Sequence, residues 1–256
     1  MLQPGRQSLH KALDFMLGAA EIGEAETLVR HVVKGLPGLV ASEITTLSLC
    51  DLTAGTRRVL SFPDNALTAA DLAAFNRVIH DHPLVQYHAT HPRGGAWRIS
   101  DSVPLTAFRD RPVYSEYYRG LGIDHVVAVP IIANPRLVMS FVLNRRGRDF
   151  ADSECALLDR IRPSLASLYR FAVARAAPPA GIGTPGVPLT PREEEVLSWV
   201  AAGKSDRQVA ALVGASVRTV QKHLANAYVK LGVENRTAAA MRLEALRRAI
   251  AVFTVG

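Results

Sequence analysis

Three helix-start signals follow one another near the end of this 256-residue chain, and their spacing constrains the fold more than any other feature. The segment Thr190–Glu193 reads Thr-Pro-Arg-Glu, a capping box with proline at the first helical position. Ser205, with a glutamine three residues on, repeats the pattern, and Ser216 gives a third, weaker cap. Gly214 can adopt the left-handed conformation that ends a helix. Short helices joined by such a glycine turn form a helix-turn-helix unit.

The apolar residues of this region follow the same division into three helices. Their periodic positions are expected to pack together: Val196, Leu197 and Val200, then Val209, Leu212 and Val213, then Val217, Val220, Leu224 and Leu231. This packing leaves an outward face on the third helix, made of Arg218, Thr219, Gln221, Lys222 and Ala225. Such a helix presents its N-terminal half to base edges in a DNA major groove. Trp199 lies at an amphipathic position and is expected in the core.

The same residues resemble the C-terminal domain of LuxR-type bacterial transcription regulators. The matching elements are Leu189–Glu193, Glu195–Leu197, Ala202–Ser205, Ser216, Thr219, Val220, His223, Lys230–Val233 and Asn235–Thr237. The resemblance implies an all-α helix-turn-helix domain of four helices, with the third in the groove and the fourth aiding dimerisation. Many relatives have a lysine directly after the Thr-Val pair, where this chain has Gln221. The target sequence of a relative therefore cannot be transferred to this chain.

Double-stranded operator DNA is the predicted partner of this domain. The residues predicted to bind it are Lys204, Ser216, Arg218, Thr219, Gln221, Lys222, His223, Lys230 and Arg236. The formal net charge of the chain is +7, and the part from Pro188 onward carries 10 basic and 6 acidic residues. Charge density is thus highest where the DNA backbone must be neutralised. RNA polymerase is a further candidate partner of such a regulator.

The rest of the chain divides into a linker and a longer domain. Residues 176–188 (AAPPAGIGTPGVP) are rich in proline and glycine and poor in charge, which predicts an interdomain linker. We therefore expect a sensing and dimerisation domain over residues 1–175 and a DNA-binding domain over residues 189–256. The elements expected in the first domain are a helix over 9–33, a strand over 43–52, a turn at 54–55, a strand over 57–62, a helix over 69–79, a strand over 97–99, paired strands over 125–133 and 137–144, and a helix over 153–175 capped by Asp152.

This order of elements favours an α+β domain with an antiparallel sheet. It resembles the GAF/PAS-like sensor folds that precede LuxR-type domains, and the local similarity lies in Val142–Arg145, Asp149–Asp152, Leu157, Leu158, Arg162 and Pro163. Sheets with helices over one face commonly enclose a small-molecule pocket. The helices expected at the two ends of the domain are placed to pair between the subunits of a homodimer.

Aromatic and histidine side chains gather between residues 82 and 118, which is the predicted sensing region. Aromatic walls with a few polar groups suit a buried small ligand. The residues expected to bind it are Tyr87, His88, Trp97, Asp101, Phe108, Tyr114 and Tyr118, and His82 and Tyr117 belong to the same group. The predicted partner is a small-molecule effector, and if Tyr87, Trp97 and Asp101 form a pocket unlike that for lactones, an aromatic or otherwise planar metabolite is favoured. Packing beneath long loops is the alternative for any single ring.

Other kinds of sensor are weighed against this one. A phosphorylated receiver domain needs an early acidic cluster, which the first 60 residues lack. An acyl-homoserine-lactone-responsive quorum-sensing regulator is the main alternative. The usual spacing of Trp, Tyr four residues on and a later Asp-Pro is missing, because Tyr87 precedes Trp97. A metal-binding sensor built on the histidines of residues 80–91 is a further alternative, although we expect no metal site there.

An enzyme is the competing class of protein. The sequence holds no glycine-rich phosphate loop, nucleophile elbow or zinc-protease signature, so we expect no catalytic residue and no cofactor. Cys50 and Cys155 match no metal-ligand spacing and are expected as reduced thiols. No apolar run approaches the roughly 18 residues of a membrane span, and no secretion signal opens the chain. A cytoplasmic protein with no membrane partner is therefore expected.

Overall fold

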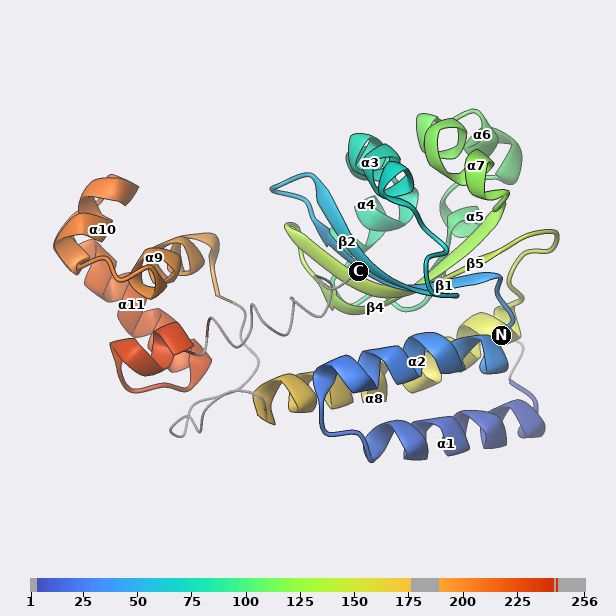
Figure 1. Cartoon of the computed structure of the whole chain (residues 1–256), viewed down its shortest axis with the longest axis horizontal. Coiled ribbons are helices and arrows are strands. Elements are labelled where there is room, and N and C mark those ends of the chain that lie inside the picture. The colour runs from blue at the N-terminus through green and yellow to red at the C-terminus, as the bar shows by residue number, and fades with distance from the viewer. Residues whose placement is uncertain (1–3, 176–188, 242, 244–256) are drawn as a thin grey trace. The chain divides into compact units, whose positions relative to one another are not determined.

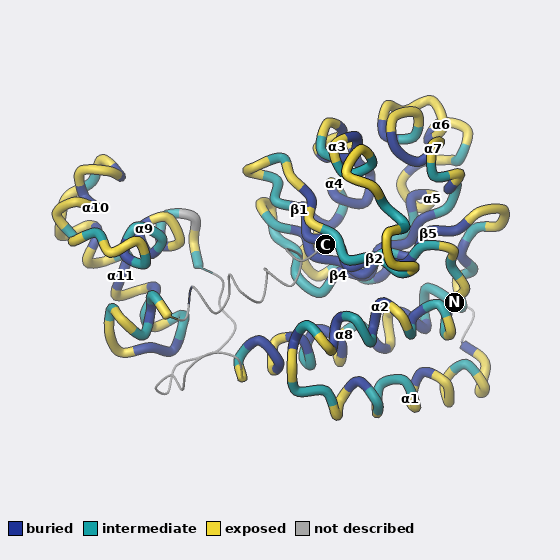
Figure 2. The backbone as a smooth tube through the Cα atoms, in the orientation of Figure 1, coloured by how far each residue is buried: buried dark blue, intermediate teal, exposed yellow. Residues whose placement is uncertain are grey.

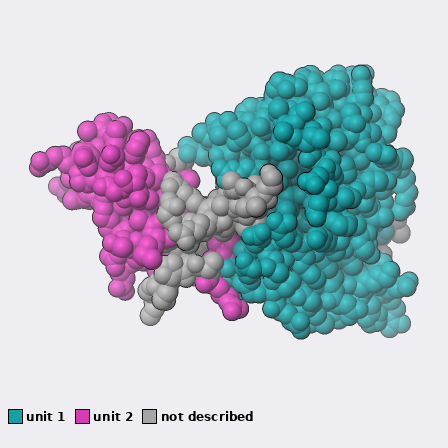
Figure 3. All heavy atoms as spheres, viewed as in Figure 1, with its two compact units in different colours: residues 1–172, 253–256 teal, residues 173–252 magenta. Residues whose placement is uncertain are grey.

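The computed structural model describes residues 4–175, 189–241 and 243. The described residues form two compact units, one of residues 4–172 and the other within residues 173–243 (Figure 3). The predicted linker, residues 176–188, lies outside the described residues. Among the helices that the structure describes, none is long and apolar enough to cross a membrane.

The first unit is built on a five-stranded sheet in the order β2-β1-β5-β4-β3, with each strand antiparallel to its neighbours. The strands are β1 (Ile44–Asp51), β2 (Thr56–Phe62), β3 (Trp97–Arg98), β4 (His125–Ala133) and β5 (Leu137–Arg145). Gly55 turns the chain between β1 and β2 with φ +64°. Between β4 and β5, the Asn134 side chain accepts hydrogen bonds from the amides of Arg136 and Leu137, both at 3.0 Å. The predicted antiparallel α+β fold is confirmed.

Helices cover both faces of this sheet (Figure 1). The helices α2 (Ala25–Leu39) and α8 (Asp152–Arg175) lie on one side, with α1 (Arg6–Ala20) packed on α2. The other side carries the segments between β2 and β4: α3 (Ala69–Val78), η1 (Ile79–Asp81), α4 (Pro83–Thr90), α5 (Ile99–Ser102), α6 (Leu105–Arg109), η2 (Tyr114–Tyr118) and α7 (Arg119–Leu121). The inner residues of β1 are therefore buried on both faces, whether apolar or polar (Figure 2).

Three local predictions in this unit are wrong. The single helix expected over residues 9–33 is two helices, because the chain reverses at residues 21–24 and α1 packs back on α2. In that packing Phe15 stacks on His31 with ring centroids 5.5 Å apart, and a Cβ on Gly35 would lie 2.5 Å from the Phe15 ring. Asp152 does not cap α8 but lies in its first turn, where Glu154 accepts the Ala151 amide at 2.7 Å. The strand at Trp97 ends one residue early, since Ile99 begins α5.

The second unit contains α9 (Pro191–Ala201), α10 (Asp206–Val213) and α11 (Val217–Leu231), and a further helical segment begins at residue 236. All three predicted caps are present, because Thr190, Ser205 and Ser216 each accept the amide N–H three residues on. Gly214 ends α10 with φ +63°. The predicted helix-turn-helix fold is confirmed.

The core of the second unit includes most of the predicted apolar positions, with two exceptions. Leu212 is 52% exposed, because Val209 and Val213 take the narrow inward seam of the eight-residue helix α10. Val217 is also exposed: it is the first residue of α11, and the buried face of this helix begins only at Val220. Trp199, which was expected in the core, is half-buried and packs against the core residues.

Candidate DNA-reading helix and sensor pocket

The helix α11 has one buried face and one exposed face. Val220, Leu224 and Ala227 are buried in the core of the second unit. The residues expected on the outward face are all exposed: Arg218, Thr219, Gln221, Lys222 and Ala225. His223 is half-buried beside this face. The exposed face thus offers two cationic groups and several hydrogen-bonding groups within the first two turns of a capped helix, which is the composition that groove reading requires.

Two of the residues predicted to bind DNA hold the unit together. Lys230 Nζ donates to Glu193 Oε2 at 2.7 Å, and the same carboxylate accepts the Thr190 amide at 2.6 Å. Burial by itself raises the pKa of Glu193, but the hydrogen bonds from Lys230 and Thr190 outweigh it and lower that pKa. Arg236 donates to Asp206 Oδ1 at 2.5 Å. These two pairs tie α9 to α11 and the start of α10 to the last helical segment.

The remaining two predicted DNA residues lie at helix ends. The carbonyl of Lys204, next to the cap of α10, accepts a hydrogen bond from Arg236. The Ser216 hydroxyl accepts the Thr219 amide at 3.1 Å and lies 2.8 Å from the Thr219 hydroxyl. In this structure, the Ser216 side chain therefore caps the N-terminus of α11.

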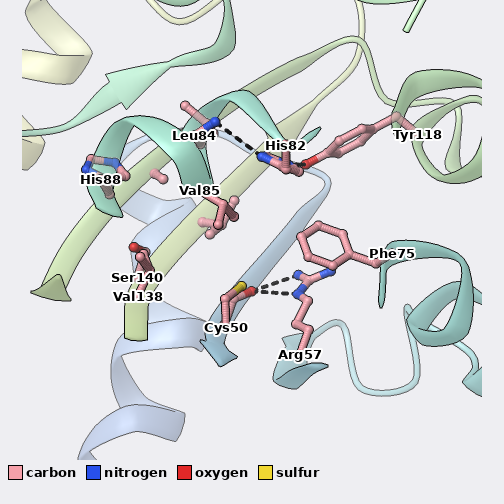
Figure 4. Close-up of a pocket in the computed structure, with 13 residues that line it drawn as sticks. Cys50, Arg57, Phe75, His82, Leu84, Val85, His88, Tyr118, Val138 and Ser140 are labelled. Atoms are coloured by element: carbon pink, nitrogen blue, oxygen red, sulfur yellow. Dashed lines mark hydrogen bonds between the residues drawn. The ribbon is translucent and has the colours of Figure 1, made fainter. Parts of the chain in front are cut away.

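A pocket lies between the sheet of the first unit and the helices α3 and α4 (Figure 4). Its volume is about 30 Å³, and its lining comes from Ser48, Cys50, Arg57, Phe75, His82, Leu84, Val85, His88, Tyr118, Ala128, Val138, Ser140 and Val142. The register of the sheet builds its floor, because Ser48 pairs with Ser140 and Cys50 with Val138 across β1 and β5. The pocket is thus assembled from four strands and from helices far away in the sequence.

Of the seven residues predicted to bind a ligand, His88 and Tyr118 line the pocket, as does His82 from the wider aromatic and histidine group. Tyr87 and Trp97 stack on each other with ring centroids 4.1 Å apart and are not among the residues that line the pocket. The other three have partners or packing of their own: Asp101 pairs with Arg98 at 2.7 Å, Tyr114 donates to Asp124, and Phe108 is fully buried in the core. A ligand role for these five residues stays a prediction.

Arg57 is the charged residue of the pocket, and the sequence reasoning missed it. The residue is 7% exposed and enters from β2 opposite Cys50. Its guanidinium donates to Ser48 Oγ from Nη2 at 2.7 Å and to Tyr117 Oη from Nη1 at 2.7 Å, and it lies 4.3 Å from the centroid of the Phe75 ring. The available signal was the pair Arg57-Arg58 in a strand, where alternation must turn one arginine inward.

Two histidines of the pocket are held in the neutral state. The Leu84 amide donates to His82 Nδ1 at 3.2 Å, so Nε2 carries the proton and donates to Tyr118 Oη at 2.7 Å. Burial, followed by the charge of Arg57, lowers the pKa of His82 to about 3. Burial also lowers the pKa of His88 to about 4. The Ala128 carbonyl interacts with the His88 ring, but neither ring nitrogen has a partner with hydrogen-bond geometry.

Metal binding gains no support from the histidines of this region. Among the described residues, no group of three or more His, Cys, Asp or Glu side chains is placed to hold a metal ion. Burial raises the pKa of Cys50 to about 11 and that of Cys155 to about 12, so both thiols stay protonated at neutral pH. The pocket therefore combines one permanent cation with neutral polar groups and apolar walls.

Fold and helix geometry together define a helix-turn-helix protein with a separate sheet-based unit that contains a pocket. The model of bacterial regulatory proteins of the luxR family matches residues 187–243. The C-terminal part of this chain therefore carries a helix-turn-helix domain of the luxR family.

Known proteins are similar to this chain in separate parts. The transcriptional activator protein AnoR of Acinetobacter nosocomialis is 46% identical over 54 residues, which cover 21% of this chain and 23% of that protein. The transcriptional activator protein LuxR of Aliivibrio fischeri is 48% identical over 48 residues, or 19% of each protein. The match thus spans less than a quarter of these relatives. The LBD domain of VqsR from Pseudomonas aeruginosa has the fold of the first unit, with a TM-score of 0.51 and 15% identity over 66% of this chain and 98% of that one.

Proposed function

We propose that this protein is a sequence-specific DNA-binding transcriptional regulator whose domain over residues 1–175 senses a small molecule. The observation that carries the proposal is the exposed polar face of α11 in a unit of the luxR family. The small-molecule part is supported by the pocket in the first unit, where a buried cation and unpartnered polar atoms face a cavity. A ligand shifts the equilibrium between two conformations of such a regulator only if it binds the two conformations with unequal affinity.

The DNA-binding part is tested with Lys222→Ala on the exposed face of α11. Because the operator is unknown, duplexes are first selected from a random pool with the unaltered protein. Losing a base contact costs about 1–3 kcal/mol, so we expect operator affinity at fixed salt to fall at least several-fold without a change in melting temperature. Lys11→Ala, an exposed lysine of α1, is the matched control and should bind as the unaltered chain does. Equal affinity of both variants would refute the assignment of the reading face.

We further propose that the protein acts as a homodimer in the bacterial cytoplasm, where its operator DNA lies. The helix α1 supports the dimer, because Leu9, Leu13 and Leu17 form an exposed apolar stripe one turn apart, with Leu13 56% exposed. Dimeric readers bind half-sites about one helical turn of DNA apart, so footprints should show a pseudo-palindrome. Leu13→Glu should convert the dimer to a monomer in light scattering. A dimer that persists at low concentration in this variant would exclude the α1 stripe as the interface.

A further inference from the structure

We propose that the pocket of the first unit takes a small carboxylate, held by the guanidinium of Arg57. This inference rests on the proposed sensing function and names the chemical class of the effector. It differs from the neutral lactones, and it adds a negative charge to the aromatic or otherwise planar metabolite considered on the sequence alone.

The first argument is the unmatched charge of Arg57. A buried guanidinium is ordinarily paired with a carboxylate, because an isolated charge is strongly disfavoured away from water. Here the acceptors of its hydrogen bonds are neutral hydroxyl oxygens, those of Thr46, Ser48 and Tyr117. None of the residues that line the pocket is Asp or Glu. Within the described residues, no carboxylate forms an ion pair with Arg57.

The second argument is a pair of neutral polar groups that face the same pocket without partners. His88 is 0% exposed, and neither ring nitrogen has a partner with hydrogen-bond geometry, although the Ala128 carbonyl interacts with the ring. The buried Ser140 Oγ is likewise unpartnered. A neutral imidazole always carries one N–H, and a hydroxyl always carries one O–H. Both donors would be satisfied by the oxygen atoms of a ligand, and a carboxylate offers several lone pairs for them.

The third argument is the charge and size of the site. With His82 and His88 neutral, Arg57 sets the pocket at one positive charge, which favours an anion over a cation or a neutral molecule. The walls are otherwise apolar and aromatic, with Phe75 stacked on the guanidinium. A cavity of about 30 Å³ has room for only a few heavy atoms. A single carboxylate on a short apolar body fits these conditions, and an aromatic body would require the pocket to open.

The test compares carboxylates with amides of the same shape. Melting curves of the full chain are recorded with acetate and acetamide, butanoate and butanamide, and benzoate and benzamide, at constant ionic strength. We expect a saturable rise in melting temperature with at least one of the three carboxylates and no comparable rise with its amide. Ligands that bind the folded state alone raise its apparent stability in this way.

The variant Arg57→Gln tests the role of the guanidinium, and Arg58→Gln is its control, because the same substitution is made at a different position. Arg57 is buried in the pocket, while the next residue of the same strand, Arg58, is exposed. Arg57→Gln should weaken carboxylate binding at least tenfold, and Arg58→Gln should leave it unchanged. If Arg57→Gln does not fold, Ser140→Ala serves as the second variant and should weaken binding several-fold. The proposal is overturned if a carboxylate and its amide bind equally well, or if no carboxylate binds. It is also overturned if carboxylate binding is unchanged in Arg57→Gln or in Ser140→Ala.

Operator binding by the same preparations separates this inference from the proposed function. If the chain binds operator DNA but no carboxylate, the ligand class is wrong and the DNA-binding regulator stands. If a carboxylate binds through Arg57 while the chain fails to bind any selected duplex, the pocket assignment stands and the regulator is wrong.

Discussion

The ion pair between Lys230 and Glu193 gives a sharp prediction about the DNA-binding unit, because it joins α11 to the start of α9. The Glu193 side chain is 4% exposed and that of Lys230 is 21% exposed, with 2.7 Å between Nζ and Oε2. Lys230→Met leaves a buried carboxylate without its cation, and Glu193→Gln removes the charge but keeps an oxygen for the Thr190 amide. The two changes therefore perturb the pair in different ways.

The magnitudes follow from the burial of the two groups. Removing one partner of a fully buried pair costs about 3–5 kcal/mol, and the partial exposure of Lys230 places Lys230→Met near the lower end. A hydrogen bond to a charged group contributes about 1.5–3 kcal/mol, which sets the expected cost of Glu193→Gln at about 2 kcal/mol. We expect a coupling free energy of about 1–2 kcal/mol in the double-mutant cycle, since contacting residues couple in this range.

The contribution of Glu193 to the stability of the second unit decreases as the pH falls. The pKa of Glu193 is lowered in the folded unit, so its contribution is complete above the unfolded carboxyl value of about 4.3. The contribution is lost as the pH falls below that value and through the lowered pKa. Glu193→Gln and the unaltered chain should therefore converge in stability in strong acid.

The assay uses the two tryptophans of the chain, one in each unit. In a Trp97→Phe background, the fluorescence of Trp199 reports urea unfolding of the second unit alone. The exposed pair Arg192–Glu195, 2.7 Å apart on the same helix, is the control, and its coupling should stay below about 0.5 kcal/mol. If the Lys230–Glu193 cycle gives no more than this control, the pair does not tie α11 to α9.

Three further predictions concern caps, turns and buried histidines. Gly214→Ala should cost about 1–2 kcal/mol in urea unfolding, because φ is +63°, whereas Gly120→Ala, with open space at its Cβ, should change stability little. Ser216→Ala should cost about 1 kcal/mol in the same assay, and a loss near zero would mean that the hydroxyl does not cap α11. The pKa of His82 falls from 6.5 to about 3 on folding, so the first unit should lose stability as the pH drops below 6.5. That loss is about 1.4 kcal/mol per buried histidine at pH 5.5. His82→Gln should remove the part of the loss that comes from His82, as measured by the fluorescence of Trp97 in a Trp199→Phe background.

The sequence alone determined the elements of the second unit. Capping at Thr190, Ser205 and Ser216 depends on contacts three residues apart, and Gly214 is needed for a local backbone angle. The outward face of α11 follows from helical periodicity. All of these signals act over a few residues, so they can be recognised without knowledge of the tertiary contacts. The exposure of Leu212 was not predictable in this way, because it depends on how many residues of α10 contact the neighbouring helices.

The tertiary structure alone decided what forms the pocket. Arg57 comes from β2, His88 from α4 and Ser140 from β5, and only the sheet register and the packing of α4 bring them together. The aromatic residues at 87 and 97 looked like a site by composition, yet they stack on each other outside the pocket. Whether a side chain points inward depends on strand register and on helices over both faces. Strand alternation indicates that either Arg57 or Arg58 points inward, but only the long-range contacts determine which polar groups meet in the pocket and which of them are buried without partners.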